Sequence, residues 1–178
     1  DAPVYAHSFE IPYLTGKQHY PKPDSSVGGG LVARMSPTFP NKSISLGDIV
    51  RVLPEDGSIP QLPDWEWIHT PGHSPGHVSF FREKDRVLIA GDAFVTVKQE
   101  SLYRVLIQEK EFSGPPKYLT TDWNAAWESV KTLEQLKPQV AITGHGVPVS
   151  GEELTTELAK LANHFASIGM PIQGRFLN

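Results

Sequence analysis

The order of the expected elements in these 178 residues predicts an α/β (α+β) domain. Short strands come first and a helix–strand–helix run follows, which is typical of folds in which helices cover a sheet. Hydrophobic residues make up 39% of the chain and charged residues 20%, the profile of a globular protein. The length fits one domain. We therefore expect one layered domain over residues 1–168 and a tail over residues 169–178.

The beginning of the chain combines short elements with a long excursion. Residues 4–6 fit a strand, and residues 8–14 fit a helix with Ser8 at its N-cap. Residues 16–42 are rich in Pro, Gly, Ser and Lys, and we expect one short helix within them, over residues 31–35. Excursions of this length often form lids or binding loops, so this one is expected to border a pocket.

Four strand-like segments follow, separated by Pro and Gly turns. They cover residues 48–53, 65–69, 76–81 and 86–90. The polar run at residues 83–85 fits the tip of a hairpin between the last two. Residues 95–118 fit no single element and contain a Gly-Pro-Pro break, so we expect this region to form a second wall of the pocket.

Two amphipathic helices are expected near the end of the chain. The first covers residues 122–136 and ends before Pro138, and the second covers residues 150–165. Ser150 and Glu153 fit a capping box at the start of the second helix. Between the helices, residues 139–143 form an apolar strand. The two apolar faces consist of Ala126, Trp127, Val130 and Leu133, and of Leu154, Leu158, Leu161 and Phe165.

Charge and cysteine content narrow the function. The formal net charge is −4, whereas nucleic acids and anionic membranes bind concentrated basic surfaces. The apolar runs are too short to span a bilayer, and no secretory signal is visible. We therefore expect a cytoplasmic protein that binds neither nucleic acid nor a membrane. The chain has no cysteine, so a metal site must use imidazole and carboxylate ligands.

Three candidate ligands, His73, Asp92 and His145, each follow a predicted strand at a glycine-rich turn. Ligands collect at such strand ends because the strand fixes the position while the loop exposes the side chain. His and Asp also suit a zinc-class ion. Taken singly, a His after a turn is more often a hydrogen-bonded loop residue, and Asp after Gly is a common turn former. Three such occurrences in one chain favour a candidate metal site, and residue types and spacing alone support no more specific conclusion.

The run Thr-Pro-Gly-His-Ser-Pro-Gly-His at residues 70–77 resembles the Thr-Pro-Gly-His-Thr-x-Gly-His signature of the metallo-β-lactamase superfamily, which includes the glyoxalase II-type thioesterases. Gly91-Asp92 resembles the Gly-Asp that ends a later strand in that family, and Gly144-His145-Gly146 resembles its last ligand motif. The resemblance covers residues 4–165. It implies the family's αββα four-layer sandwich, incomplete at the N-terminus.

The same resemblance implies a role for each matched residue. His73 would be a ligand of the first metal and His145 a ligand of the second, while Asp92 would bridge both ions and is the expected catalytic residue. The implied cofactors are two divalent ions, zinc with manganese or iron as alternatives, because His/Asp sites accept all three. His77 either supports the site through a hydrogen bond behind it or is an ordinary buried strand residue.

One departure from the family pattern stands out. The family's His-x-His-x-Asp-His motif is absent from these 178 residues. In the family it precedes a segment like residues 3–14, so we expect it upstream of Asp1, where it would supply two ligands for each metal. Catalytic zinc generally needs three protein ligands. We therefore expect this chain alone to bind metal weakly, to be inactive and to need the missing N-terminal segment as its partner.

For the intact protein, the resemblance implies a hydrolase that activates water at its metals against a small ester, thioester, lactone or related substrate. Two alternatives stay open: a degenerate, non-catalytic binding module of the same fold, and a metal-free α/β binding domain with structural histidines. Some aromatic residues are candidates for lining an apolar cleft, with core packing as the alternative for each. They are Tyr20, Phe39, Phe94 and Tyr103.

Overall fold

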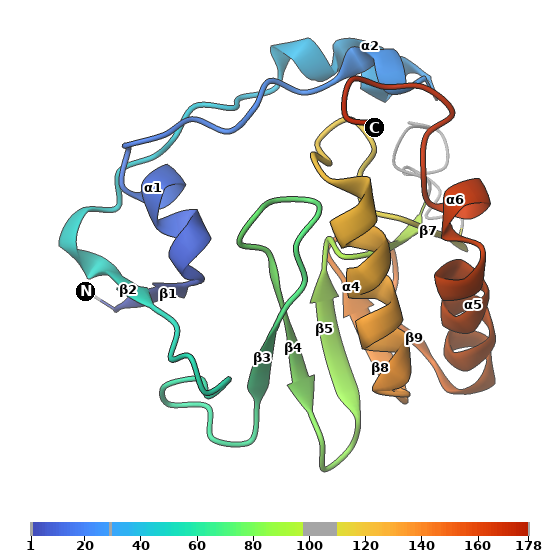
Figure 1. Ribbon diagram of the computed structural model, residues 1–178. Coiled ribbons are helices and arrows are strands. Elements are labelled where there is room, and N and C mark those ends of the chain that lie inside the picture. Colours follow the sequence, from blue (N-terminus) through green and yellow to red (C-terminus); the bar gives the residue numbers. More distant parts are fainter. Residues whose placement is uncertain (1, 29, 98–109, 178) are drawn as a thin grey trace.

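A computed structural model describes residues 2–28, 30–97 and 110–177 of the protein (Figure 1). Its centre is a five-stranded sheet with the strand order β3-β4-β5-β8-β9. The central pair, β5 and β8, runs parallel, and the other neighbours pair antiparallel. The strands are β3 (Glu66–His69), β4 (Val78–Arg82), β5 (Val87–Gly91), β8 (Val140–Thr143) and β9 (Val149–Ser150).

Helices α4 (Trp123–Gln135) and α5 (Gly151–Asn163) cover one face of this sheet (Figure 1). Successive residues of a strand point to opposite faces, and one set of alternate residues is buried against these helices. That set contributes Phe81, Leu88, Ala90 and Ala141 to the main apolar core. The expected apolar faces of both helices enter the same core, and removing this area from water stabilises the layered arrangement.

The opposite face of the sheet carries a second apolar row. Direct cross-strand pairing connects Trp67 to Phe80, Phe80 to Ile89 and Ile89 to Ile142. A cavity of about 360 Å³ lies against Phe80 and Ile89, and Ile142 is 41% exposed. Among the residues that the structure describes, this row is therefore only partly covered.

Smaller elements surround the sheet. Strands β1 (Val4–Ala6) and β2 (Val50–Val52) pair in parallel, and β6 (Val95–Val97) pairs antiparallel with β7 (Lys110–Ser113). The short helices are α1 (Ile11–Leu14), α2 (Leu31–Met35) and α6 (Phe165–Ile168). Within the described parts of the chain, no helix has the length and apolar character of a membrane span.

The C-terminal tail returns to the excursion that carries α2, as Figure 1 shows. The Arg175 backbone N–H donates to the buried Asp24 carboxylate, and Gln173 Nε2 donates to the Ser26 carbonyl over 2.8 Å. Residues at opposite ends of the sequence therefore hold the excursion over the edge of the sheet.

Most of the expected elements are confirmed, including the helix over residues 31–35 and the hairpin between β4 and β5. Several expectations about their ends are wrong. Residues 8–14 divide into a 3-10 turn (Ser8–Glu10) and α1, because Pro12 in the first turn of α1 has no N–H with which to continue the preceding turn. The cap is His7, whose Nδ1 accepts from the Phe9 N–H. The strand expected over residues 48–53 begins as another 3-10 turn (Gly47–Ile49).

The expected capping box is also wrong. Ser150 is the extended last residue of β9 and makes no side-chain cap hydrogen bond, while Glu153 pairs with Lys110 at 2.9 Å. The helix also ends earlier than expected, at Asn163, because His164 leaves the helical conformation before α6 begins. Within the unassigned region over residues 95–118, β6 and β7 lie at the two ends, and residues 98–109 fall outside the described part.

Candidate metal centre

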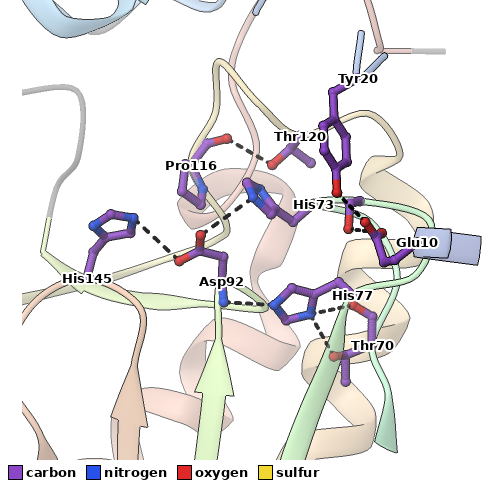
Figure 2. Close-up of polar contacts among 10 residues, drawn as sticks. Glu10, Tyr20, Thr70, His73, His77, Asp92, Pro116, Thr120 and His145 are labelled. Atoms are coloured by element: carbon purple, nitrogen blue, oxygen red, sulfur yellow. Dashed lines mark hydrogen bonds and ion pairs between the residues drawn. The ribbon is translucent and has the colours of Figure 1, made fainter. Parts of the chain in front are cut away.

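The sheet topology brings the three expected ligands to one edge. Parallel pairing places Gly91 of β5 beside Thr143 of β8, so Asp92 and His145 leave neighbouring strands in the same direction. Strand β4 runs antiparallel to β5, so the loop between β3 and β4, which carries His73, reaches this edge as well. Figure 2 shows the three side chains turned toward one another.

Asp92 lies between the two histidines. Its Oδ2 atom is 3.5 Å from His73 Nε2, and its Oδ1 atom is 3.6 Å from His145 Nε2. Both distances exceed an ordinary hydrogen bond, so each carboxylate oxygen faces one imidazole without bonding to it. In the part of the chain that the structure describes, no three His, Asp or Glu side chains form a complete metal-binding group.

The polar atoms of this cluster fit a bound cation. Asp92 Oδ1 and His73 Nδ1 are buried and have no hydrogen-bond partner among the described residues. A buried carboxylate oxygen without a donor is costly, and a divalent cation would supply the missing interaction. Gly144 leaves room for this oxygen, because a Cβ atom there would lie 2.3 Å from Asp92 Oδ1. The local backbone is thus shaped around the carboxylate.

The loop that carries His73 is fixed to the start of α4. The Gly72 carbonyl accepts hydrogen bonds from the backbone N–H groups of Thr121 and Asp122, at 3.0 and 3.1 Å. Gly72 itself has φ of +132°, and a Cβ atom there would meet Ala126 of α4 at about 2.5 Å. Only glycine allows this close approach. The helix therefore sets the position of His73.

His77 supports the cluster from behind (Figure 2). Its Nε2 atom accepts a 2.9 Å hydrogen bond from the Asp92 backbone N–H, and its Nδ1 atom lies 2.9 Å from Thr70 Oγ1 and 3.1 Å from the Thr70 carbonyl. Burial, and then the neighbouring His73, lower the pKa of His77 to about 4. Of the two expectations for His77, the geometry matches the supporting role.

The protonation of His73 also suits a ligand. Burial lowers the pKa of His73 below its ordinary value, and the Asp92 carboxylate opposes this shift without cancelling it. A lowered pKa keeps the imidazole neutral near pH 7, and the neutral ring is the form that binds metals.

The turn that carries His145 is held by two threonines. Thr143 Oγ1 donates to the His145 carbonyl over 2.8 Å, and the Thr96 backbone N–H donates to the same carbonyl over 3.2 Å. The His145 side chain remains 46% exposed, while those of His73 and Asp92 are 17% and 21% exposed. The cluster is therefore buried at His73 and open at His145.

A cavity of about 400 Å³ adjoins the cluster. His73, His77 and Asp92 form one side of it. The excursion forms another through Tyr20, Pro21, Pro40 and Asn41, and Leu119 and Thr121 complete the lining next to Ser74 and Pro75. The expectation that residues 16–42 border a pocket is thus confirmed. The described part of residues 95–118 contributes nothing to this lining.

The aromatic candidates divide among three positions. Tyr20 lines the cavity, as expected. Phe94 is fully buried in the main core, and Phe39 packs against Tyr118 with ring centroids 5.7 Å apart, so core packing is the correct explanation for both. Tyr103 lies outside the described residues.

Glu10 belongs to the site and was not expected from the sequence. Its Oε1 atom accepts from Ser74 Oγ over 2.6 Å and from the Gly76 N–H over 2.9 Å, and its Oε2 atom accepts from the Tyr20 hydroxyl. Ser74 follows His73 directly, so Glu10 links the loop of a candidate ligand to the wall of the cavity. No local motif marks Glu10, because its partners Ser74 and Gly76 lie far away in the sequence.

The architecture places the chain among α/β proteins that gather His and Asp side chains at the strand ends of one sheet. The family described as the metallo-beta-lactamase superfamily matches residues 1–145. The chain therefore belongs to the metallo-β-lactamase superfamily, and the predicted fold class is confirmed.

Individual relatives agree with this assignment. The chain is 52% identical over 170 residues to the "Probable metallo-hydrolase YflN" of Bacillus subtilis (strain 168), covering 94% of this chain and 64% of the relative. The structure of TTHA1623 in a di-iron-bound form matches with a TM-score of 0.53 at 26% identity, over 92% of this chain and 64% of the other.

A third match shows the fold alone. The archaeal superfamily protein ST1585 from Sulfolobus tokodaii matches with a TM-score of 0.57 at 22% identity, over 90% of this chain and 58% of that one. The present chain thus spans less than two thirds of the length of each of these three proteins.

Proposed function

We propose that the complete protein is a metal-dependent hydrolase and that His73, Asp92 and His145 bind its metals. The observation that carries this proposal is the position of Asp92, with one carboxylate oxygen toward each histidine and a buried Oδ1 that has no donor. Superfamily membership supports it, as does the similarity to a protein named a probable metallo-hydrolase.

The arrangement favours two ions with Asp92 between them. Zinc, manganese and iron all accept His and Asp ligands, and TTHA1623, a fold relative, is described in a di-iron-bound form. When bound, such ions would polarise a substrate oxygen and lower the pKa of water toward neutrality, so that water attacks a carbonyl carbon. This chain's own part is to hold the ions apart through Asp92, whose backbone His77 fixes.

The remaining ligands, in this proposal, come from a segment outside these 178 residues that carries the His-x-His-x-Asp-His motif. Two features support this. Each histidine of the cluster faces Asp92 without a third ligand among the described residues, and YflN is longer than this chain. The same segment would cover the apolar row of Phe80, Ile89 and Ile142 on the second face of the sheet.

The substrate proposed is a small ester, thioester or lactone. The cavity of about 400 Å³ lies directly against His73 and Asp92, so a substrate held there presents its carbonyl to the metal ligands. Pro21, Pro40 and Leu119 give the cavity an apolar wall, which suits the acyl or alkyl part of such a molecule.

The test uses the full-length protein, its metal content and a substrate panel. We expect metal binding, together with hydrolysis of at least one class among 4-nitrophenyl esters, acyl thioesters and aliphatic lactones, and loss of both on chelation. Asp64→Asn, at an exposed carboxylate outside the site, serves as the control. Metal binding without turnover of any class would favour the non-catalytic binding module, and failure to bind metal would overturn the proposal.

A further inference from the structure

Glu10 is tied to three donors on two different segments. Ser74 and Gly76 belong to the loop that carries His73, and Tyr20 belongs to the excursion. The loop accommodates this carboxylate closely, since a Cβ atom on Gly76 would lie 2.7 Å from Glu10 Cγ. Figure 2 shows Glu10 and Tyr20 on the side of His73 that faces away from His145. Glu10 therefore joins the cavity wall to the candidate ligand loop.

Tyr20 is held by three independent contacts. Its hydroxyl donates to Glu10, and its ring stacks on the buried Tyr13, with centroids 4.1 Å apart and planes within 9°. Its backbone N–H donates to the Asn41 carbonyl over 3.1 Å, and Asn41 Nδ2 returns a 2.9 Å bond to the Tyr20 carbonyl. A side chain restrained at ring, hydroxyl and backbone contacts a ligand without a further loss of conformational entropy.

The chemistry of the phenol is restricted as well. Burial, and then the hydrogen bond to Glu10, raise the pKa of Tyr20. The phenol stays neutral, and its one proton is committed to the carboxylate. Tyr20 therefore presents to the cavity a ring surface and a lone-pair oxygen, next to Pro21 and Pro40.

We propose that Tyr20 is a specificity-determining residue for the acyl chain of the substrate, beyond the reacting carbonyl, and that Glu10 is the positioning residue that holds Tyr20. This inference rests on the proposed hydrolase function. In it, the carbonyl of the substrate lies at Asp92 and His73, and the acyl chain extends toward the excursion. The fixed ring of Tyr20 limits how long or how bulky that chain is.

The experiment compares full-length wild type, Tyr20→Ala, Tyr20→Phe, Glu10→Gln and the double variant Tyr20→Phe/Glu10→Gln. The control is Tyr5→Phe, at a tyrosine on the other side of the sheet. The substrates are 4-nitrophenyl acetate, butyrate and octanoate. For Tyr20→Ala we expect the octanoate-to-acetate ratio of kcat/KM to rise about tenfold. The reason is that enlarging an apolar pocket changes the discrimination between a long and a short substrate by about this factor.

The positioning role of Glu10 has its own outcome. Glutamine keeps the size of the side chain but offers one acceptor oxygen for three donors, so the Tyr20 ring is released in part. We expect Glu10→Gln and Tyr20→Phe to raise KM for the ester that the wild type prefers, and the double variant to add nothing to the effect of Glu10→Gln on KM, because both changes break the contact between Tyr20 and Glu10. A lowered melting temperature with an unchanged KM in Glu10→Gln would reduce Glu10 to a purely structural role.

A binding measurement separates the hydrolase proposal from the proposal for Tyr20. Calorimetry measures how the metal-free protein binds the amide analogues of 4-nitrophenyl acetate and 4-nitrophenyl octanoate. A wild type that hydrolyses no ester, thioester or lactone overturns the hydrolase proposal, and the affinity ratio of the two amides still tests Tyr20. If folded Tyr20→Ala leaves both ratios within about twofold of the wild type, the role of Tyr20 is overturned. If Tyr20→Ala fails to fold, the same comparison is made with Tyr20→Leu, which also removes the aromatic ring.

Discussion

The backbone N–H of Asp92 donates a hydrogen bond to His77 Nε2 over 2.9 Å. Because Nε2 accepts, the ring proton must lie on Nδ1, which donates to Thr70 at the end of β3. The neutral imidazole thus joins two neighbouring loops behind the candidate ligands. A Cβ atom on Gly91 would lie 2.7 Å from His77 Nε2, so the glycine before Asp92 makes this contact feasible.

Replacement of His77 tests this supporting contact. In His77→Gln of the full-length protein, the Asp92 backbone loses a rigid acceptor, and we expect metal affinity to fall about 10- to 100-fold, the usual effect of losing a hydrogen-bond partner behind the ligands. Competition with a chelating dye measures this affinity. The control His164→Gln changes an exposed histidine between α5 and α6. Equal affinities for both variants would contradict the supporting role.

The lowered pKa of His77 predicts how stability depends on pH. Burial, and then His73, lower this pKa from 6.5 to about 4, so folding favours the neutral ring. Above pH 6.5 the ring is neutral in both states. As the pH falls from 6.5 toward about 4, the unfolded chain binds a proton that the folded protein excludes, so the free energy of unfolding decreases across this range and the loss is complete below about 4. For metal-free protein, we expect the free energy of unfolding, from denaturant titrations, to decrease over this window and to decrease less in His77→Gln. Parallel pH curves for the two proteins would refute this.

Gly144 offers a test of the space around the carboxylate. In Gly144→Ala the new methyl group would collide with Asp92 Oδ1 at 2.3 Å, so the carboxylate has to turn away from the two histidines. We expect loss of metal and activity with near-wild-type circular dichroism. Thr156→Ala, at an exposed position of α5, is the control for protein expression and folding. Full metal retention in Gly144→Ala would show that the position of the Asp92 carboxylate does not depend on the space beside Gly144.

Ile142 tests whether a further segment covers the second face of the sheet. The side chain is 41% exposed in the described structure, and surface substitutions of this kind usually change stability by less than about 0.5 kcal/mol. If the proposed segment packs on the row of Phe80, Ile89 and Ile142, Ile142→Ser should instead lower the unfolding free energy of the full-length protein by about 1–3 kcal/mol. Ile172→Ser, at a fully exposed position, serves as the control. Similar small effects in both variants would contradict the coverage.

The cluster of His73, Asp92 and His145 could be predicted from the sequence because each of these candidate ligands lies next to a local signal. Asp92 and His145 directly follow apolar strands, and His73 lies in a run that resembles a family signature, so neighbouring residues suffice to mark them. Glu10 carries no such signal: its partner Ser74 is 64 residues away, and only the packing of the 3-10 turn against the β3–β4 loop brings them together. Tyr20 is only 10 residues from Glu10, but the two lie in different elements, and only the folded arrangement of the excursion brings them into contact.

The helices were recognised more reliably than the short strands. Helix α4 has an apolar face that repeats at helical spacing, whereas β6 has only three residues, too few for a pattern of alternation to mark it as a strand. Strand β9 has only two residues. It also explains the failed capping box, because Ser150 takes part in the sheet before α5 begins. Tertiary pairing thus overrides a local motif at this position.

The metal content of the full-length protein and of its Asp92→Asn variant tests the central claim most directly. Asparagine keeps the shape of the side chain but not the charge that faces His73 and His145. We predict about two equivalents of divalent metal in the wild type, as in two-metal hydrolases, and a loss of at least one equivalent in Asp92→Asn, with the melting temperature of the chelated protein unchanged. Wild-type metal content in Asp92→Asn would contradict the claim that Asp92 binds the ions.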